Sequence, residues 1–181
     1  MYSNQLETQD LVLGKMKPDD AQKMLDNFWR HEQTAKYMLW PTTNNYQDAV
    51  ARVERSIKFQ AERMAYTVYE KSSGEPIGLA GMIEVEPNVW EDAGIGIGPK
   101  FVGKGYGTQI LRALVDECFR IGATKIICSC FKDNLPSKKM QIKFGFEYTH
   151  SEEKIREKDG LKYVADFHVL TKEKYQSLYK K

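Results

Sequence analysis

The chain has 181 residues, about the length of one domain, and its 27 Lys and Arg against 25 Asp and Glu give a formal charge of +2. A charge this close to zero argues against a dedicated nucleic-acid-binding protein, which normally carries a basic domain or stripe. Segment 1–10 is polar and lacks the apolar core of a signal sequence, and no stretch approaches the ~20 apolar residues that span a bilayer. We therefore expect one cytoplasmic domain over residues 1–181 with no nucleic-acid or membrane partner.

The first half of the chain predicts a short strand, two helices and an antiparallel meander of three strands. Apolar residues at helical spacing follow Pro18 and Tyr46, and alternating patterns separated by Gly, Pro and Asn turns follow Ala65. The expected elements are a strand over 11–16, a helix that begins at Pro18 and includes Phe28, a helix over 46–59, and strands over 66–70, 77–85 and 89–97. An aromatic connector, residues 37–41, links the two helices.

The second half predicts a helix, a strand, a helix and two late strands. The expected elements are a helix after Lys100 that Gly122 ends, a strand over 126–131, a helix capped by Asn134 and ended by Gly145, and strands over 146–149 and 163–170. Segment 151–161 is a charged connection, and residues 171–181 form an exposed or short helical tail. This order predicts an α/β (α+β) domain with a mixed, mostly antiparallel sheet flanked by helices.

The cysteines and histidines show no spacing typical of a disulfide framework or a metal site. These residues are Cys118, Cys128, Cys130, His31, His150 and His168. We expect buried thiols and no metal. Cys118 lies on the apolar face of a predicted helix and is therefore a poor candidate for a nucleophile.

The segment most informative about function joins the strand that ends at Ile97 to the following helix. Its glycines, Gly103, Gly105 and Gly107, remove Cβ atoms where a loop becomes a helix. Successive backbone N–H groups can then converge on an anion at the positive end of the helix dipole. The segment therefore predicts a phosphate cradle, to which Lys104 adds a charge; the alternative is a turn that only lets strand and helix pack closely.

Three other phosphate-binding motifs fit this segment poorly. A Walker loop needs Gly-Lys-Ser/Thr after a four-residue spacer, and a kinase glycine loop joins two strands. A Rossmann loop follows the first strand of a parallel unit, whereas three hairpin-connected strands precede this one. A nucleotide-binding protein that merely shares the glycine loop remains a minor alternative.

Residues 102–107 resemble the acyl-CoA pyrophosphate loop of the GNAT family of N-acetyltransferases, Gln/Arg-x-x-Gly-x-Gly/Ala. Gly105 and Gly107 match this motif, and Val102 replaces its usual Gln or Arg. Segments 134–137, Asn-Leu-Pro-Ser, and 143–146, Lys-Phe-Gly-Phe, are similar to the family's later motifs and follow at the expected separation.

Two further segments, 92–99 and 166–173, are similar to the branch of that family that includes the ribosomal-protein N-terminal acetyltransferases. The resemblance covers nearly the whole chain and implies a single domain whose central strand pair is splayed. It also implies that acetyl-CoA is the co-substrate.

In this family a bulged strand exposes main-chain groups to pantetheine and to the thioester carbonyl. The alternative explanation of the glycines in this strand is that they only allow a sheet edge to pack closely. That strand falls on residues 95–97 of this chain. The resemblance implies that CoA contacts Ile95, Gly96, Ile97, Val102, Gly103, Lys104, Gly105, Tyr106, Gly107, Thr108 and Asn134. Helix capping alone would also explain Asn134.

Amine acetylation needs a base for the ammonium proton and an acid for the departing thiolate. Asp92 matches an acidic position of the family, and Glu84 on the preceding strand is the alternative base; either carboxylate could instead be a solvated strand residue. Many members place a Tyr at the position of Gln141, which cannot donate a titrating proton. Ser137 is then the candidate acid, or an ordinary first-turn hydroxyl.

The resemblance places the acceptor between the two early helices and the late hairpin. Aromatic side chains expected to wall this pocket, or else to pack in the core, are Tyr37, Trp40, Tyr46 and Trp90. An exposed sheet edge near residues 163–170 is expected to pair in a homodimer or to lie under the tail in a monomer.

The expected function is acyl-CoA-dependent N-acetyl transfer to a primary amine, a protein N-terminus or a small molecule, by direct attack in a ternary complex. Because Val102 and Gln141 depart from the family pattern, the alternative is a non-catalytic module that binds or senses acyl-CoA.

Overall fold

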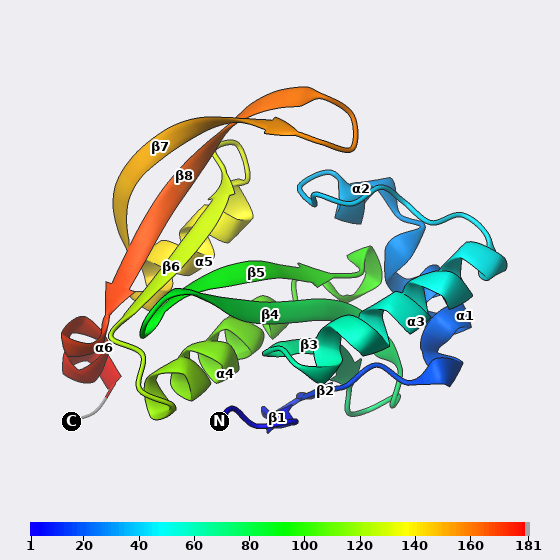
Figure 1. Ribbon diagram of the computed structural model, residues 1–181, viewed down its shortest axis with the longest axis horizontal. Coiled ribbons are helices and arrows are strands. Elements are labelled where there is room, and N and C mark those ends of the chain that lie inside the picture. The colour runs from blue at the N-terminus through cyan, green and yellow to red at the C-terminus, as the bar shows by residue number, and fades with distance from the viewer. Residues whose placement is uncertain (180–181) are drawn as a thin grey trace.

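A computed structural model describes residues 1–179 of the chain, whose strands form one eight-stranded sheet in the order β1-β2-β3-β4-β5-β6-β8-β7 (Figure 1). Neighbouring strands run antiparallel except for β5 and β6, which are parallel. The predicted fold class, a mixed and mostly antiparallel sheet flanked by helices, is therefore confirmed.

Strands and helices are interleaved along the whole chain. The first half consists of β1 (Leu6–Glu7), β2 (Leu11–Gly14), the 3-10 helix η1 (Pro18–Asp20), α1 (Ala21–Met24), the π-helix η2 (Leu25–Trp29), α2 (Glu32–Ala35), α3 (Tyr46–Ala61), β3 (Ala65–Glu70), β4 (Pro76–Glu86) and β5 (Val89–Ile97). The second half consists of the 3-10 helix η3 (Pro99–Phe101), α4 (Tyr106–Arg120), β6 (Lys125–Phe131), α5 (Leu135–Phe144), β7 (Glu147–Arg156), β8 (Leu161–Thr171) and α6 (Lys172–Tyr179).

Three local expectations were wrong. The helix expected after Pro18 is divided into η1, α1 and η2, and α2 was not anticipated. The charged segment after Ser151 continues as strand to Arg156. Backbone pairing with β8 stabilises β7, which has no alternating apolar pattern from which the strand could be predicted. Strand β8 lies between β6 and β7 and is not an edge. The predicted helical tail is confirmed over α6, and its last two residues, 180 and 181, lie outside the described residues.

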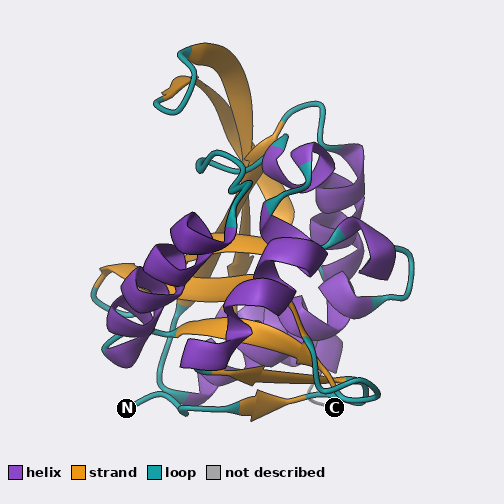
Figure 2. Cartoon of the chain, turned by 90° about the vertical axis from the view of Figure 1, so that its right-hand side faces the viewer, coloured by secondary structure: helices purple, strands orange, loops and turns teal. Residues whose placement is uncertain are grey.

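Helices lie on both sides of the sheet (Figure 2). The larger core packs apolar side chains of α4, such as Ile110 and Leu114, against the sheet, and Tyr175 of α6 joins it. A second core packs α1, η2 and α3 around Trp29, with Leu79 of β4 beneath it. No helix among the described residues is long and apolar enough to cross a bilayer.

Strands β5 and β6 pair only near their starts. Val89, Trp90 and Glu91 pair with the first three residues of β6, and the last of these pairs joins Glu91 to Ile127. Beyond that point β5 stays on β4 while β6 pairs with β8, so the sheet splits. The split leaves one backbone edge of β5 without a strand partner among residues 1–179.

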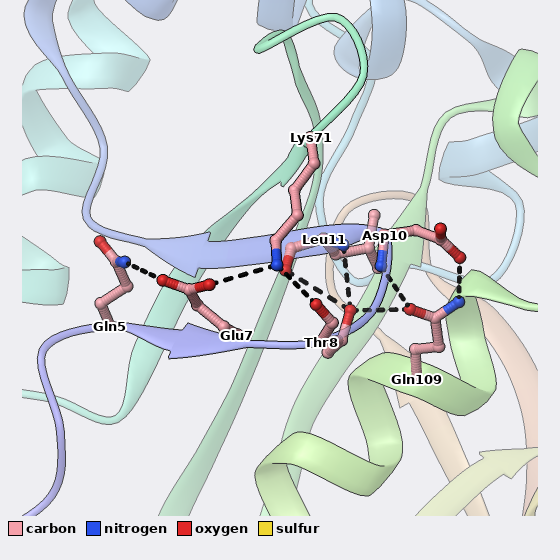
Figure 3. Close-up of polar contacts among 7 residues, drawn as sticks. All are labelled: Gln5, Glu7, Thr8, Asp10, Leu11, Lys71 and Gln109. Carbon is pink, nitrogen blue, oxygen red and sulfur yellow. Dashed lines mark hydrogen bonds and ion pairs between the residues drawn. The ribbon is translucent and has the colours of Figure 1, made fainter.

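Gln109, one turn into α4, ties that helix to the turn between β1 and β2 (Figure 3). Its Oε1 accepts hydrogen bonds from Thr8 Oγ1 at 2.7 Å and from the backbone N–H of Asp10 at 3.1 Å. Its Nε2 donates to Asp10 Oδ2 at 2.6 Å. The amide thus bonds through both ends, which fixes the start of α4 against the sheet edge.

We expect Gln109→Ala to lower the free energy of unfolding by about 1–3 kcal/mol, since it leaves partly buried polar groups without partners. Urea denaturation measures this change. Gln5→Ala is the control, because Gln5 makes a single exposed hydrogen bond to Glu7 at 3.1 Å and should cost less than about 0.5 kcal/mol. Equal losses in the two variants would contradict the role given to Gln109.

Candidate active site

Asp92 lies where β5 and β6 begin to separate. Its Oδ2 accepts a hydrogen bond from the backbone N–H of Ser129 on β6 at 2.7 Å, and its Oδ1 accepts one from Gly94 N–H at 3.3 Å. Burial raises the pKa of this carboxyl to about 6, although both hydrogen bonds favour the charged form. A carboxylate with such a pKa is ionised at neutral pH and remains a competent proton acceptor.

The part of β5 beyond Asp92 is irregular. The pairing of β4 with β5 shifts register between Ala80 and Met82, and Gly94 has φ of +101°. Ile95 and Ile97 pack toward the larger core, so their side chains anchor the strand while its free edge faces the split.

Gly96 lies on the opposite face of β5, beneath η2 and the connector that follows α2. A Cβ at this position would lie 2.6 Å from Cε of Met38 and 2.8 Å from Cζ of Phe28. The close contact explains the need for glycine at this position.

The loop before α4 has the geometry of an anion site. Gly103 and Gly105 have φ of +83° and +79°, and a Cβ on either would meet nothing within 4 Å. The N–H groups of Tyr106, Gly107 and Thr108 lie in the first helical turn, where no preceding helical carbonyl reaches them. These donors and the helix dipole favour a phosphate at this position.

Glu70 of β3 holds one side chain of this loop and the side chain of the first residue of α4. Its Oε1 accepts hydrogen bonds from Tyr106 Oη at 2.7 Å and from Lys104 Nζ at 3.1 Å. Tyr106 and then Lys104 lower the pKa of this buried carboxyl. Val102 is 63% exposed beside the loop and contributes no polar group. The amides and the dipole are therefore the chief attraction for an anion, since Glu70 partly offsets the charge of Lys104.

Ser137 lies in the first turn of α5, beside the Cys130 thiol of β6. Asn134 caps the helix by accepting from Ser137 N–H at 3.3 Å. Ser137 Oγ accepts from Nε2 of the buried Gln141 at 3.2 Å, so the serine proton is free to point elsewhere. Asn134 thus has the capping contact that the sequence offered as one explanation for it.

Glu84 lies toward the closed end of the β4–β5 hairpin, in register with Trp90. Its carboxylate accepts a hydrogen bond from Asn88 N–H at 2.8 Å, which stabilises the hairpin turn. The split opens toward the other end of β5. The structure therefore does not bring Glu84 together with the glycine loop or with Ser137.

A pocket of about 510 Å³ lies on the other face of β4 and β5, under η2, the following connector and α3. Of the four predicted wall residues, only Trp40 lines it. Tyr37 lines a separate hollow of about 600 Å³ between α2 and the β7–β8 hairpin. Tyr46 is 54% exposed outside both, and Trp90 is buried in the larger core.

Sequence reasoning did not identify the pocket's two cations, Arg52 and Arg55. They stand three residues apart on one face of α3, and this spacing was the only signal available. No group of three or more His, Cys, Asp or Glu residues within 1–179 is arranged to hold a metal ion.

The model of the acetyltransferase (GNAT) domain family matches residues 10–147, well over half of the chain. No curated protein matches the sequence. Among solved structures, a GCN5-related N-acetyltransferase from Brucella melitensis superposes with a TM-score of 0.85 at 15% identity, over 97% of this chain and 82% of that one.

Two further structures share the fold. The microcin C7 self-immunity acetyltransferase MccE, solved with acetyl-CoA and AMP, has a TM-score of 0.77 at 19% identity over 91% of this chain and 93% of its own. A ribosomal-protein-serine acetyltransferase from Vibrio cholerae, itself named as putative, has a TM-score of 0.75 at 21% identity over 92% of this chain and 97% of its own. With a family model that covers most of its length, this chain belongs to the GNAT family of acetyltransferases.

Proposed function

We propose that this protein transfers the acetyl group of acetyl-CoA to a primary amine by direct attack in a ternary complex. The observation that carries this proposal is the split between β5 and β6 beside the amide-lined start of α4. The split presents an unpaired strand edge, and the start of α4 presents N–H groups that can donate hydrogen bonds to a phosphate. Pantetheine and pyrophosphate, the two middle parts of CoA, need these two surfaces next to each other.

The cofactor fits the residues present. The open space at Gly103 and Gly105 admits a pyrophosphate to the main chain, and the free edge of β5 offers peptide groups to the pantetheine amides. Acetyl-CoA bound to MccE, a protein of the same fold, supports this choice. In this proposal the main chain replaces the charge that Gln or Arg would supply at Val102.

Asp92 acts as the base in this proposal. It accepts the proton that the acceptor amine must lose, directly or through water, and main-chain N–H groups of the bulged strand polarise the thioester carbonyl. The position of Asp92 at the point where β5 and β6 separate supports this role.

The Ser137 hydroxyl donates a hydrogen bond to the departing thiolate sulfur, and the released thiolate takes its proton from water. Gln141 orients the hydroxyl through the 3.2 Å hydrogen bond from its Nε2 to Oγ. It occupies the position of a titrating residue but cannot donate a proton itself. The absence of a titrating acid at this position fits an enzyme that releases a thiolate, since a thiol with a pKa near 8.5 leaves readily.

We also propose kinship with the ribosomal-protein branch and a place in the cytoplasm. The motif-like segments 92–99 and 166–173 support the first of these. The acceptor is then a protein N-terminus or a small amine, and the pocket beside β5 is its proposed entrance.

Acetyl-CoA at about 100 times its dissociation constant should stabilise the protein by roughly 2.7 kcal/mol, while ATP and NAD should not. Gly105→Ala should weaken acetyl-CoA binding about tenfold or more, because a side chain would occupy the phosphate position and strain the left-handed backbone. Thermal unfolding and calorimetry measure these effects.

Gly160→Ala is the matched control for the loop variant. Gly160 has φ of +70° with nothing within 4 Å, so the backbone strain is similar but the turn is remote from α4. Its acetyl-CoA affinity should be unchanged. Binding without thiol release for any amine would favour the non-catalytic alternative, and equal stabilisation by ATP would favour a nucleotide site.

Asp92→Asn should lower kcat about 10²–10⁴-fold while acetyl-CoA still binds. Since only the ionised carboxylate accepts a proton, wild-type kcat should fall as the pH drops through about 6, and the variant should lose this limb. Glu91→Gln, on the same strand, is the control: it should keep the rate at neutral pH and retain the limb, displaced to lower pH because the Glu91 charge helps to raise the pKa of Asp92. A comparable loss in Glu84→Gln, with Asp92→Asn active, would transfer the role to Glu84.

A further inference from the structure

The pocket against β5 holds two cations that lack a carboxylate partner. Arg52 and Arg55 project from consecutive turns of α3 into its lining, where all the other lining residues are neutral. No carboxylate within residues 1–179 makes an ion pair with either guanidinium. The pocket is therefore positively charged, although the protein as a whole is nearly neutral.

Arg52 is held in place but not neutralised. Its Nη1 donates to Thr43 Oγ1 at 2.9 Å and to the carbonyl oxygen of Pro41 at 3.3 Å. The guanidinium also stacks over Trp40, 4.2 Å from the ring centroid. Burial and the nearby charge of Arg55 lower the pKa of Arg52 to about 10. These hydrogen bonds use one nitrogen, so the rest of the donor fork remains available.

The cations of the second hollow provide a comparison. There Arg156 forms an ion pair with Asp159 at 2.6 Å, and Lys158 Nζ donates to the carbonyl oxygens of Ala35 and Trp40 at 2.6 and 3.1 Å. Lys158, and Arg156 through the carbonyl oxygen of Lys36, fasten the β7–β8 hairpin to the end of α2 and the residues after it. Arg52 and Arg55, unlike Arg156, have no carboxylate partner, which leaves them for a ligand.

The pocket also extends along β5 toward the point where the sheet splits. Gly94 and Gly96 of β5 form one side of it, and they follow Asp92 along the strand, although Asp92 itself does not line the pocket. Aromatic side chains of Phe28, Trp40 and Phe59 line the space between β5 and α3. A ligand that spans the pocket thus meets strand main chain at one end, aromatic rings in the middle and guanidinium groups at the other.

We propose that the acceptor is an amine that carries an anionic group, a carboxylate or a phosphate, which Arg52 and Arg55 bind while the amine reaches β5. This inference rests on the proposed N-acetyltransferase function and narrows its acceptor class. It excludes polyamines and other polycations, since two unpaired arginines would repel them. The aromatic lining favours an apolar or planar spacer between amine and anion.

Calorimetry with three matched amines tests the proposal: 4-(aminomethyl)benzoate, 4-(aminomethyl)phenyl phosphate and the uncharged 4-(aminomethyl)benzamide, each with and without CoA. At least one anionic amine should bind about tenfold or more tightly than the carboxamide, as expected for charge-assisted hydrogen bonds. The tighter of the two anions identifies carboxylate or phosphate as the recognised group.

Arg55→Gln should reduce this preference about threefold or more. Lys58→Gln is the matched control, because Lys58 is an exposed cation on the same helix that does not line the pocket. Its preference should match that of the wild type. Equal affinity for all three amines, no binding of any, or an unchanged preference in Arg55→Gln would overturn the inference.

The same experiment separates this inference from the proposed function. Thiol release from acetyl-CoA with the carboxamide or spermidine as the best acceptor would retain the enzyme and reject the anionic acceptor. Arginine-dependent binding of an anion without acetyl-CoA binding would reject the transferase and retain the anion site.

Discussion

The early end of β5–β6 pairing is the constraint on which the site depends. Three paired residues hold the two strands together, and beyond Glu91 each follows a different neighbour. Unpaired strand edges are costly unless another chain or a ligand covers them. Asp92 joins the two strands at the point where they separate, because its carboxylate accepts a hydrogen bond from Ser129 N–H. The carboxylate proposed as base therefore lies where the split begins.

The start of α4 must be held against this opening. Gln109 ties the helix to the β1–β2 turn (Figure 3), and Glu70 fixes Lys104 of the preceding loop and Tyr106, the first residue of α4. Both anchors come from β1, β2 and β3, which β4 and β5 separate from β6 in the order of the sheet. These contacts attach the anion site to the same sheet that carries the split, whereas the proposed acceptor pocket lies under the π-helix η2 and under α3.

Sequence reasoning predicted what local chemistry determines. Glycine spacing located the loop at Gly103 and Gly105, and capping residues located α5. It missed what depends on distant segments: the extension of β7 comes from pairing with β8, and the π-helix at Leu25–Trp29 from packing under α3. The sequence also could not predict the contact between Glu84 and Asn88 or the stacking of Arg52 on Trp40. The direction of a side chain and its contacts depend on tertiary structure.

Backbone amide hydrogen exchange with saturating acetyl-CoA tests the central claim most directly, because it reports on the strand edge and the helix start at once. The account predicts slower exchange in residues 103–108 and in residues 92–97, with ATP giving no protection of the second segment. Unchanged exchange in both segments, or protection of 103–108 alone, would contradict the claim that the split binds the cofactor.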